Sequence, residues 1–358
     1  MVTVCNSCRY CEEYCAVFPA ITRRLSFGRG DLDYLAHLCH NCGECLYACQ
    51  YAPPHTFAID IPRMLAQTRL ASYEHYCWPA PLARSFRRHS VASALIISAV
   101  LSSILAVATW VFNPQGLALA QRQGDFYTVV PHFAMVTLFG AVGLFVVAAI
   151  AVGVQRFWRE SHAGPLPRRS HVARGVRDAL TLRNLHGSGR DCTIHEEQRT
   201  PWRRWFHHCT FYGFLLCFAS TSAAAVYHQV FGWIAPYGYT SAPVVLGTVG
   251  GLGLLVGPIG LLWQRRRRDP ALNDPDQDGL DESFMVLLWL TSLTGLLLLI
   301  LRDGPWMAPL LVVHLGVVLA LFVTLPYGKF MHGLYRTAAL VKAAVEQDRR
   351  GTGRGINL

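Results

Sequence analysis

Residues 5–15 read CNSCRYCEEYC, and residues 39–49 read CHNCGECLYAC. Both stretches have the spacing Cys-x2-Cys-x2-Cys-x3-Cys, which is typical of bacterial proteins that hold two [4Fe–4S] clusters. A cubane cluster needs four thiolates; a tight loop supplies three of them, and a more distant cysteine supplies the fourth. The two runs therefore predict a small ferredoxin-like domain, residues 1–75, with two [4Fe–4S] clusters.

The ligand sets follow from the same precedent, in which the fourth cysteine of each run binds the other cluster. The expected metal ligands are Cys5, Cys8, Cys11 and Cys49 for one cluster, and Cys39, Cys42, Cys45 and Cys15 for the other. The proline that usually follows the fourth cysteine is missing, since Ala16 and Gln50 stand there. Zinc is the alternative, but zinc sites built from two Cys-x2-Cys pairs leave the 2-2-3 spacing unexplained. The remaining cysteines have no such spacing, and Cys192 has no evident role.

The rest of the chain is too apolar for a soluble protein. Of the 358 residues, 52% are hydrophobic and 15% are charged, whereas soluble domains have about 25% charged residues. Apolar stretches of roughly 17–25 residues can cross a bilayer. Six such stretches are present: Val91–Phe112, Phe126–Val154, Phe206–Phe231, Val244–Trp263, Phe284–Leu301 and Trp306–Leu325. The predicted fold is an α-helical membrane protein with six transmembrane helices in residues 91–335.

The basic residues predict how the chain is oriented. The net charge of +10 is concentrated between the apolar stretches, which points to membrane orientation rather than to nucleic-acid binding. Residues 76–90 read as a basic interfacial linker, residues 155–205 as a long connection rich in arginine, and residues 336–358 as a tail with a short fraying helix. By the positive-inside rule these segments and both termini are cytoplasmic. Because Cys5 follows Met1 so closely, we expect no signal peptide before the first cysteine run. The chain is expected to be a multi-pass protein of the bacterial inner membrane.

Histidines in the apolar stretches predict haem b, which two imidazoles from two helices would hold. His314 and His332 are 18 residues apart, about five helical turns, and His207 and His228 are 21 apart, about six. Antiparallel helices would then pair His207 with His332 and His228 with His314, giving one haem or two. Two reserve candidates are His208, which is out of phase, and His132, which could instead serve a quinone. Plain packing or interfacial roles for these histidines remain open.

The order of these parts resembles the citrate/tricarballylate utilisation protein B family. The resemblance covers nearly the whole chain, and its most specific pieces are CNSCRYC at 5–11, CHNCGEC at 39–45 and HHCTFYGF at 207–214. It implies a chain that reoxidises the reduced FAD of a partner dehydrogenase acting on tricarballylate or a similar tricarboxylate. The electrons would then pass to the membrane quinone pool.

The residues themselves also favour electron transfer. A glycine-rich dinucleotide fingerprint is missing from the sequence, so the flavin is expected on a partner chain, and no side chain needs to act as a general base. The expected route is flavin, two clusters, haem b and quinone. The alternative is a haem-free membrane anchor and quinone-binding subunit of another iron–sulfur oxidoreductase complex. Transport of the tricarboxylate is the weakest hypothesis, because the apolar stretches contain no arginine.

Overall fold

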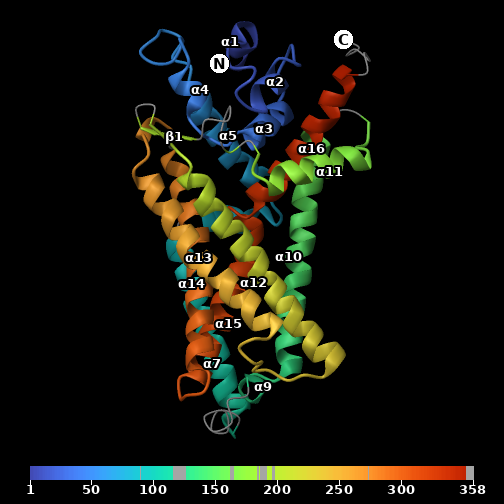
Figure 1. Cartoon of the computed structure of the whole chain (residues 1–358), viewed down its shortest axis with the longest axis vertical. Helices are drawn as coiled ribbons and strands as arrows, with labels where there is room; N and C mark the ends of the chain where they lie inside the picture. The colour runs from blue at the N-terminus through green and yellow to red at the C-terminus, as the bar shows by residue number, and fades with distance from the viewer. Residues whose placement is uncertain are drawn as a thin grey trace.

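The computed structural model describes residues 1–88, 90–115, 126–161, 165–183, 185, 192–195, 198–272 and 274–351. The molecule is a long helical bundle with the N-terminal domain at one end (Figure 1). The C-terminal helix reaches the same end. We call this the domain end of the bundle. The opposite end carries the short helix α9, Phe126–Val129.

The N-terminal domain is made of short helices joined by tight turns. They are α1 Val2–Cys8, α2 Val17–Ile21, α3 Arg29–Leu38, α4 Glu44–Tyr47, α5 Ile61–Tyr76 and α6 Ala80–Arg88. The Asp60 carboxylate caps α5 by accepting a hydrogen bond from the Arg63 amide at 3.0 Å, which satisfies a donor that the first helical turn leaves free. The predicted linker 76–90 is thus largely helical.

Six helices are long and apolar enough to cross a membrane, judged by length and composition within the described residues. They are α7 Ser90–Phe112, α10 His132–Ser161, α12 Trp202–Phe231, α13 Ala242–Arg266, α14 Pro275–Leu301 and the helix that begins with α15 Met307–Thr324. The prediction of a six-helix membrane protein with a cysteine-rich N-terminal domain is confirmed.

The bounds of the second span differ from the prediction of 126–154. Pro131 has no amide proton to donate, so α9 ends before it and α10 begins at His132. The helix then continues past residue 154 to Ser161, beyond the apolar stretch. His132 consequently lies at the first turn of α10, at the end of the second candidate span.

The sixth span is interrupted where the sequence arithmetic assumed a continuous helix. Around Pro326 the chain forms the short 3-10 helix η2, Leu325–Tyr327. Gly328 is then extended (φ −104°, ψ −170°), and α16 runs from Met331 to Gly351. Counting whole turns from His314 to His332 was therefore wrong, because the two residues belong to different helices.

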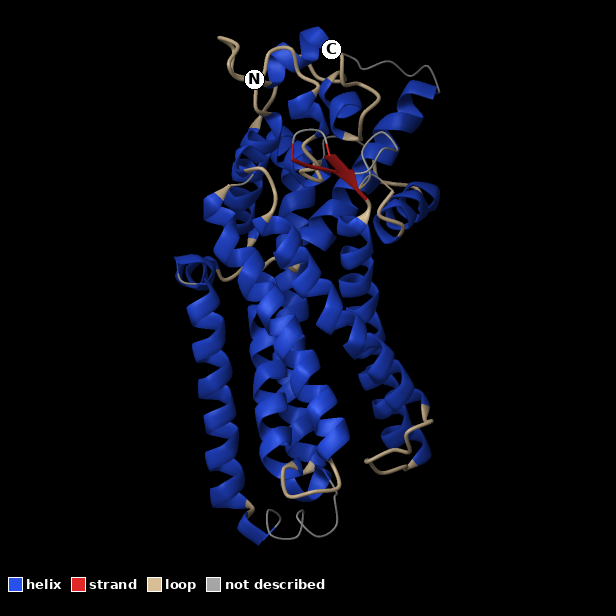
Figure 2. Cartoon of the chain, turned by 60° about the vertical axis from the view of Figure 1, so that its left-hand side comes forward, coloured by secondary structure: helices blue, strands red, loops and turns tan. Residues whose placement is uncertain are grey.

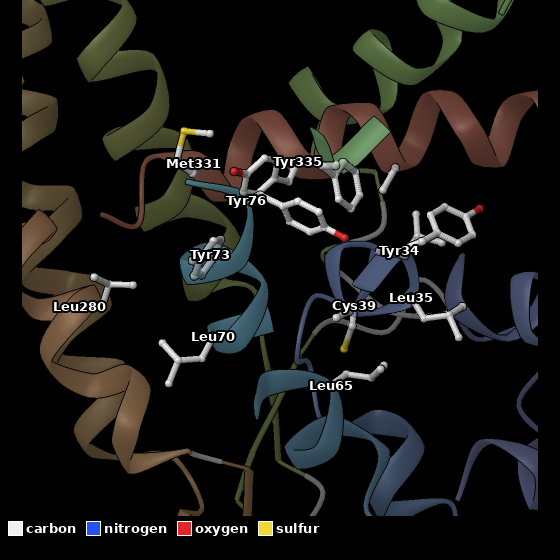
Figure 3. Packing of buried hydrophobic residues seen from close by; sticks show 14 of the residues in the cluster. Tyr34, Leu35, Cys39, Leu65, Leu70, Tyr73, Tyr76, Leu280, Met331 and Tyr335 are labelled. Carbon is white, nitrogen blue, oxygen red and sulfur yellow. The ribbon is translucent and has the colours of Figure 1, made fainter. Parts of the chain in front are cut away.

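Helix α16 packs against the rest of the chain as far as Asp348, so the expectation of a short fraying helix after Tyr335 was wrong for that part. Its Val341 lies against α11, Arg169–Leu180, where a Cβ on Gly175 would come within 2.7 Å of the Val341 backbone nitrogen. Tyr335 is fully buried and its ring lies 5.0 Å from that of His37 in α3. Figure 3 shows Tyr335 and Met331 of α16 in one apolar cluster with Tyr73 and Tyr76 of α5.

Glu346 of α16 ties the end of the chain to its beginning. Its carboxylate accepts hydrogen bonds from Arg24 at 2.6 Å, Arg23 at 3.3 Å and the Tyr34 hydroxyl at 3.2 Å. Lys342 lies over the Tyr34 ring, 4.1 Å from its centroid. The N-terminal domain is therefore held by charged groups of the last helix.

Replacing Glu346 with alanine is expected to destabilise this junction by about 3 kcal/mol, because two half-buried guanidinium groups lose their shared carboxylate. Thermal unfolding of the purified chain and the rate of limited proteolysis measure the effect. Glu74→Ala is the matched control, since its ion pair with Arg84 spans 3.9 Å and is solvent-exposed, and such pairs are worth under about 1 kcal/mol. Equal losses in both variants would contradict the role of Glu346.

Small residues let α12 and α13 approach closely. A Cβ on Gly257 would lie 2.7 Å from the Thr210 backbone nitrogen and 2.8 Å from the Phe206 carbonyl oxygen. This contact fixes the first turns of α12, which carry His207 and His208. A two-stranded antiparallel hairpin, β1 Cys192–His195 and β2 Gln198–Thr200, precedes α12 at the domain end (Figure 2).

Candidate functional site

The second cysteine run folds around a narrow pocket. Cys15, Cys39, Cys42 and Cys45 all line it, together with apolar residues of α2 and α5. Asn41 and Gly43 adopt positive φ angles of 52° and 87°, which turn the loop back on itself, and Gly43 lies against the side chain of Leu272. The Asn41 amide donates to the Cys39 sulfur at 3.3 Å. Four thiols from two separate stretches of the chain thus face one space.

The first cysteine run forms the other group with Cys49. Burial, together with the thiols of Cys49 and Cys8, raises the pKa of Cys5 to about 11. Burial and the thiols of Cys49, Cys5 and Cys8 raise the pKa of Cys11 to about 12. Burial, then Cys42 and Cys39, likewise raises the pKa of Cys15. The thiols that raise one another's pKa values are mainly those placed in the same ligand set in the sequence analysis. The ligand sets themselves stay a prediction.

Both groups suit an iron–sulfur cluster in their chemistry. Within the described ranges, no three Cys, His, Asp or Glu side chains are arranged to hold a single metal ion. The four thiolates of a [4Fe–4S] cluster lie further apart than the ligands of a single metal ion, because each binds a separate corner of the cluster. Buried thiols with raised pKa values stay protonated until a metal binds them.

A cavity of about 480 Å³ lies between this domain and the helices, within the usual size range of cofactor sites. Cys39 and His40 line it from the domain, His207 from α12 and His332 from α16. Phe211, Phe214, Leu261, Phe284 and Leu288 are among its apolar lining residues.

His207 and His332 face each other across part of this cavity. Their ring centroids are 6.0 Å apart and their planes differ by 76°. Two imidazoles on opposite sides of one metal, each bonded at about 2 Å, have centroids roughly 6 Å apart. The Nδ1 atom of His332 lies 2.6 Å from the Lys329 carbonyl oxygen; donating there leaves Nε2 unprotonated and able to bind a metal. The pair therefore suits the axial ligands of a haem.

The other histidines have different neighbours. His228 lies against His132, with ring centroids 3.9 Å apart, and Tyr127 is 4.9 Å from His228. His314 faces α14, where its Nδ1 is 2.9 Å from the Thr294 hydroxyl. In the described part of the chain the predicted pairing of His228 with His314 is not found, because α15 presents His314 to α14 while α12 packs on α13.

His208 is turned away from His332. Its ring stacks on Tyr212 one turn further along α12, with centroids 5.6 Å apart and planes 13° apart. His207, and not His208, therefore lies next to His332, while the role of either residue as a haem ligand stays a prediction. A single histidine pair with the spacing of haem ligands is found among the described residues, and the second predicted haem has no matching pair there.

Comparison with known proteins identifies the family. The model of the citrate utilization protein B Fer4-like domain matches residues 1–75, and the model of citrate utilization protein B matches residues 86–353. The chain belongs to the citrate utilization protein B family. One relative, citrate utilization protein B of Escherichia coli, is 49% identical over 360 residues, covering 99% of this chain and 93% of its own. No solved structure matches.

Membership of the citrate utilization protein B family supports a ferredoxin-like domain on a multi-pass membrane protein, but it does not reveal the basic side chains at the site. Sequence reasoning missed His40, whose pKa burial and the nearby Arg336 and Arg203 lower well below the usual range. It also treated Arg203 of the 155–205 connection and Arg336 of the tail as signs of membrane orientation alone. The position of His40 in the sequence could have indicated that it lies at the site, because it stands between two predicted ligands, Cys39 and Cys42.

Proposed function

We propose that this chain is a membrane electron-transfer subunit of a flavoprotein:quinone oxidoreductase. It accepts electrons from the reduced FAD of a partner tricarballylate or tricarboxylate dehydrogenase and delivers them to the quinone pool. Two [4Fe–4S] clusters and one haem b carry single electrons when bound. The domain end faces the cytoplasm of a bacterial inner membrane, as the basic connections favour.

One observation carries the proposal: a thiol of the second cysteine group and the histidine pair line the same cavity. Cys39, His207 and His332 reach it from three different elements. Apolar and charged side chains line the cavity around the histidine pair, and His332 is oriented through its hydrogen bond to the Lys329 carbonyl. These residues would bring a cluster and a haem close to one another.

The partner is inferred from two considerations. The sequence has no glycine-rich dinucleotide fingerprint, so the flavin is assigned to a separate chain. The relative in Escherichia coli is named for citrate utilization, which favours a tricarboxylate as the substrate of that partner. The carboxylate chemistry takes place on the dehydrogenase, and this chain binds and orients the electron carriers.

Purification from the native membrane in a mild detergent tests the proposal. Non-haem iron, acid-labile sulfide, haem b and a flavoprotein are expected together. Tricarballylate or citrate should reduce the haem, seen in its visible absorption bands, and a short-chain quinone should reoxidise it. A preparation without haem bands after dithionite would favour the haem-free anchor. Haem that neither substrate reduces would overturn the assigned partner.

A further inference from the structure

One short stretch of chain separates the narrow pocket of the second cysteine group from the large cavity. Cys39, His40 and Asn41 line the pocket, and the same three residues line the cavity that the histidine pair faces. We call these three residues the shared wall. A cluster in the pocket and a haem in the cavity would lie on its two sides.

Helix α12 holds the shared wall from the membrane part of the chain. Arg203 donates to the carbonyl oxygens of Asn41 and His40, both at 2.9 Å. His207 stands four residues further along α12, so the two side chains lie on the same face of the helix, one turn apart. The side chain that holds the wall is therefore closely spaced from one that faces the cavity.

Helix α16 repeats this arrangement with the opposite chain direction. Arg336 donates to the Cys39 carbonyl at 2.5 Å and to Nδ1 of His40. His332 stands four residues earlier in α16, again one turn away on the same face. Helix α12 runs away from the domain end and α16 runs toward it (Figure 1). Both arginines consequently lie on the domain side of their histidines.

Other elements also support the shared wall, and they carry neither histidine of the pair. Arg69 of α5 is buried and donates to the Ala36 carbonyl at 2.9 Å and to the Cys39 carbonyl at 3.1 Å. The Asn41 side-chain amide donates to the Leu272 carbonyl at 3.0 Å. A change at one arginine of α12 or α16 should therefore shift the wall relative to that helix without unfolding the cysteine run.

We propose that Arg203 and Arg336 are positioning residues that fix the distance between the cluster of the second cysteine group and the histidine pair. Each guanidinium is a planar fork that reaches two acceptors of the shared wall. Transfer between two bound carriers depends steeply on their separation, so the protein must hold both in place.

This inference rests on the proposed function and gives it a route. The electron leaves the second cluster across the shared wall and arrives at the iron between the histidines. The cluster is oxidised by one electron and the iron is reduced by one, and no bond forms or breaks.

Pulse radiolysis of the purified full-length chain tests the proposal. Methyl viologen radicals deliver single electrons, and the haem absorption bands then report transfer within the chain. That phase should not depend on protein concentration, and it should be absent in Cys42→Ser, which lacks the second cluster. Arg203→Lys and Arg336→Lys are each expected to slow it several-fold, because lysine keeps the charge but cannot reproduce the planar fork.

A second measurement does not depend on electron transfer. Loss of one charge-assisted hydrogen bond from the shared wall should raise the amide hydrogen exchange of residues 38–41 by about tenfold in either lysine variant. The amide of Cys39, which donates to the Leu35 carbonyl at 3.1 Å, is the most direct reporter. Iron and haem content should match the unaltered chain.

Arg204→Lys is the matched control. Arg204 is the next residue of α12, and among the described residues it has no hydrogen bond to the shared wall, so both measurements should stay unchanged. Equal slowing in Arg204→Lys and Arg203→Lys would overturn the proposal. So would slowing that is accompanied by a matching shift of the cluster or haem potential in a redox titration, since a changed driving force would then explain the rate.

The outcomes separate this inference from the proposed function. A purified chain without haem would overturn both. Clusters and haem present, with the unaltered transfer rate in both lysine variants, would overturn the positioning role alone. Failure of the partner assignment affects neither measurement, because a chemical reductant supplies the electrons.

Discussion

Replacing Cys42 with serine is expected to remove about half of the non-haem iron and acid-labile sulfide from the purified chain. A serine hydroxyl is a much poorer iron ligand than a thiolate, and the cubane needs all four thiolates. Cys42 lines the pocket of the second group with Cys15, Cys39 and Cys45. Iron and sulfide analysis, with the loss of one of two paramagnetic signals after reduction, measures the effect.

Cys209→Ser is the matched control for this change. Cys209 lies in α12, away from both cysteine groups, and belongs to the membrane part of the chain. Its replacement should leave iron and sulfide at the level of the unaltered chain. If Cys42→Ser kept a full complement of iron, the assignment of the second group would be wrong. A zinc content of one ion per cysteine group would overturn the clusters altogether.

Replacing His332 or His207 with alanine is expected to abolish haem b binding. The two rings are 6.0 Å apart, as two axial ligands of one iron would be, and either replacement leaves only one of them. Reduced-minus-oxidised spectra and pyridine haemochrome assays on the purified variants give the haem per chain. Iron bound by the cysteines should persist, because the two sites share no ligand.

His208→Ala is the control for the histidine pair, since it changes the adjacent residue of the same helix turn. Its ring stacks on Tyr212 rather than facing His332, so haem content should stay at the unaltered level. Loss of haem in His208→Ala with retention in His207→Ala would reverse the assignment. Retention in all three variants would exclude a haem held by this pair.

The broad fold could be predicted because its signals are local in sequence. A stretch of uncharged residues that can span a bilayer is recognised from neighbouring residues, and so is a fixed cysteine spacing. The six spans and the ferredoxin-like domain could therefore be predicted from the sequence. His207 and His332 do lie close together, but the helical counting behind their pairing assumed one continuous helix from His314, which the break at η2 excludes.

Other features depend on contacts that no local pattern reports. Because the chain breaks at η2, His332 belongs to a different helix from His314, and the helical counting between them does not apply. The neighbour of His228 in the described structure is His132. Arg69 and Arg336 both donate to the Cys39 carbonyl although they lie more than 260 positions apart, so in the sequence they could only look like separate basic residues.

The placement of α16 has a consequence for biosynthesis. The ribosome makes the cysteine runs first, yet Arg336 and Glu346 support them from the last helix. The contacts between the N-terminal domain and α16 can therefore form only after the whole chain has been made. A nascent chain that stalls before α16 would leave the second cysteine run without the support of Arg336.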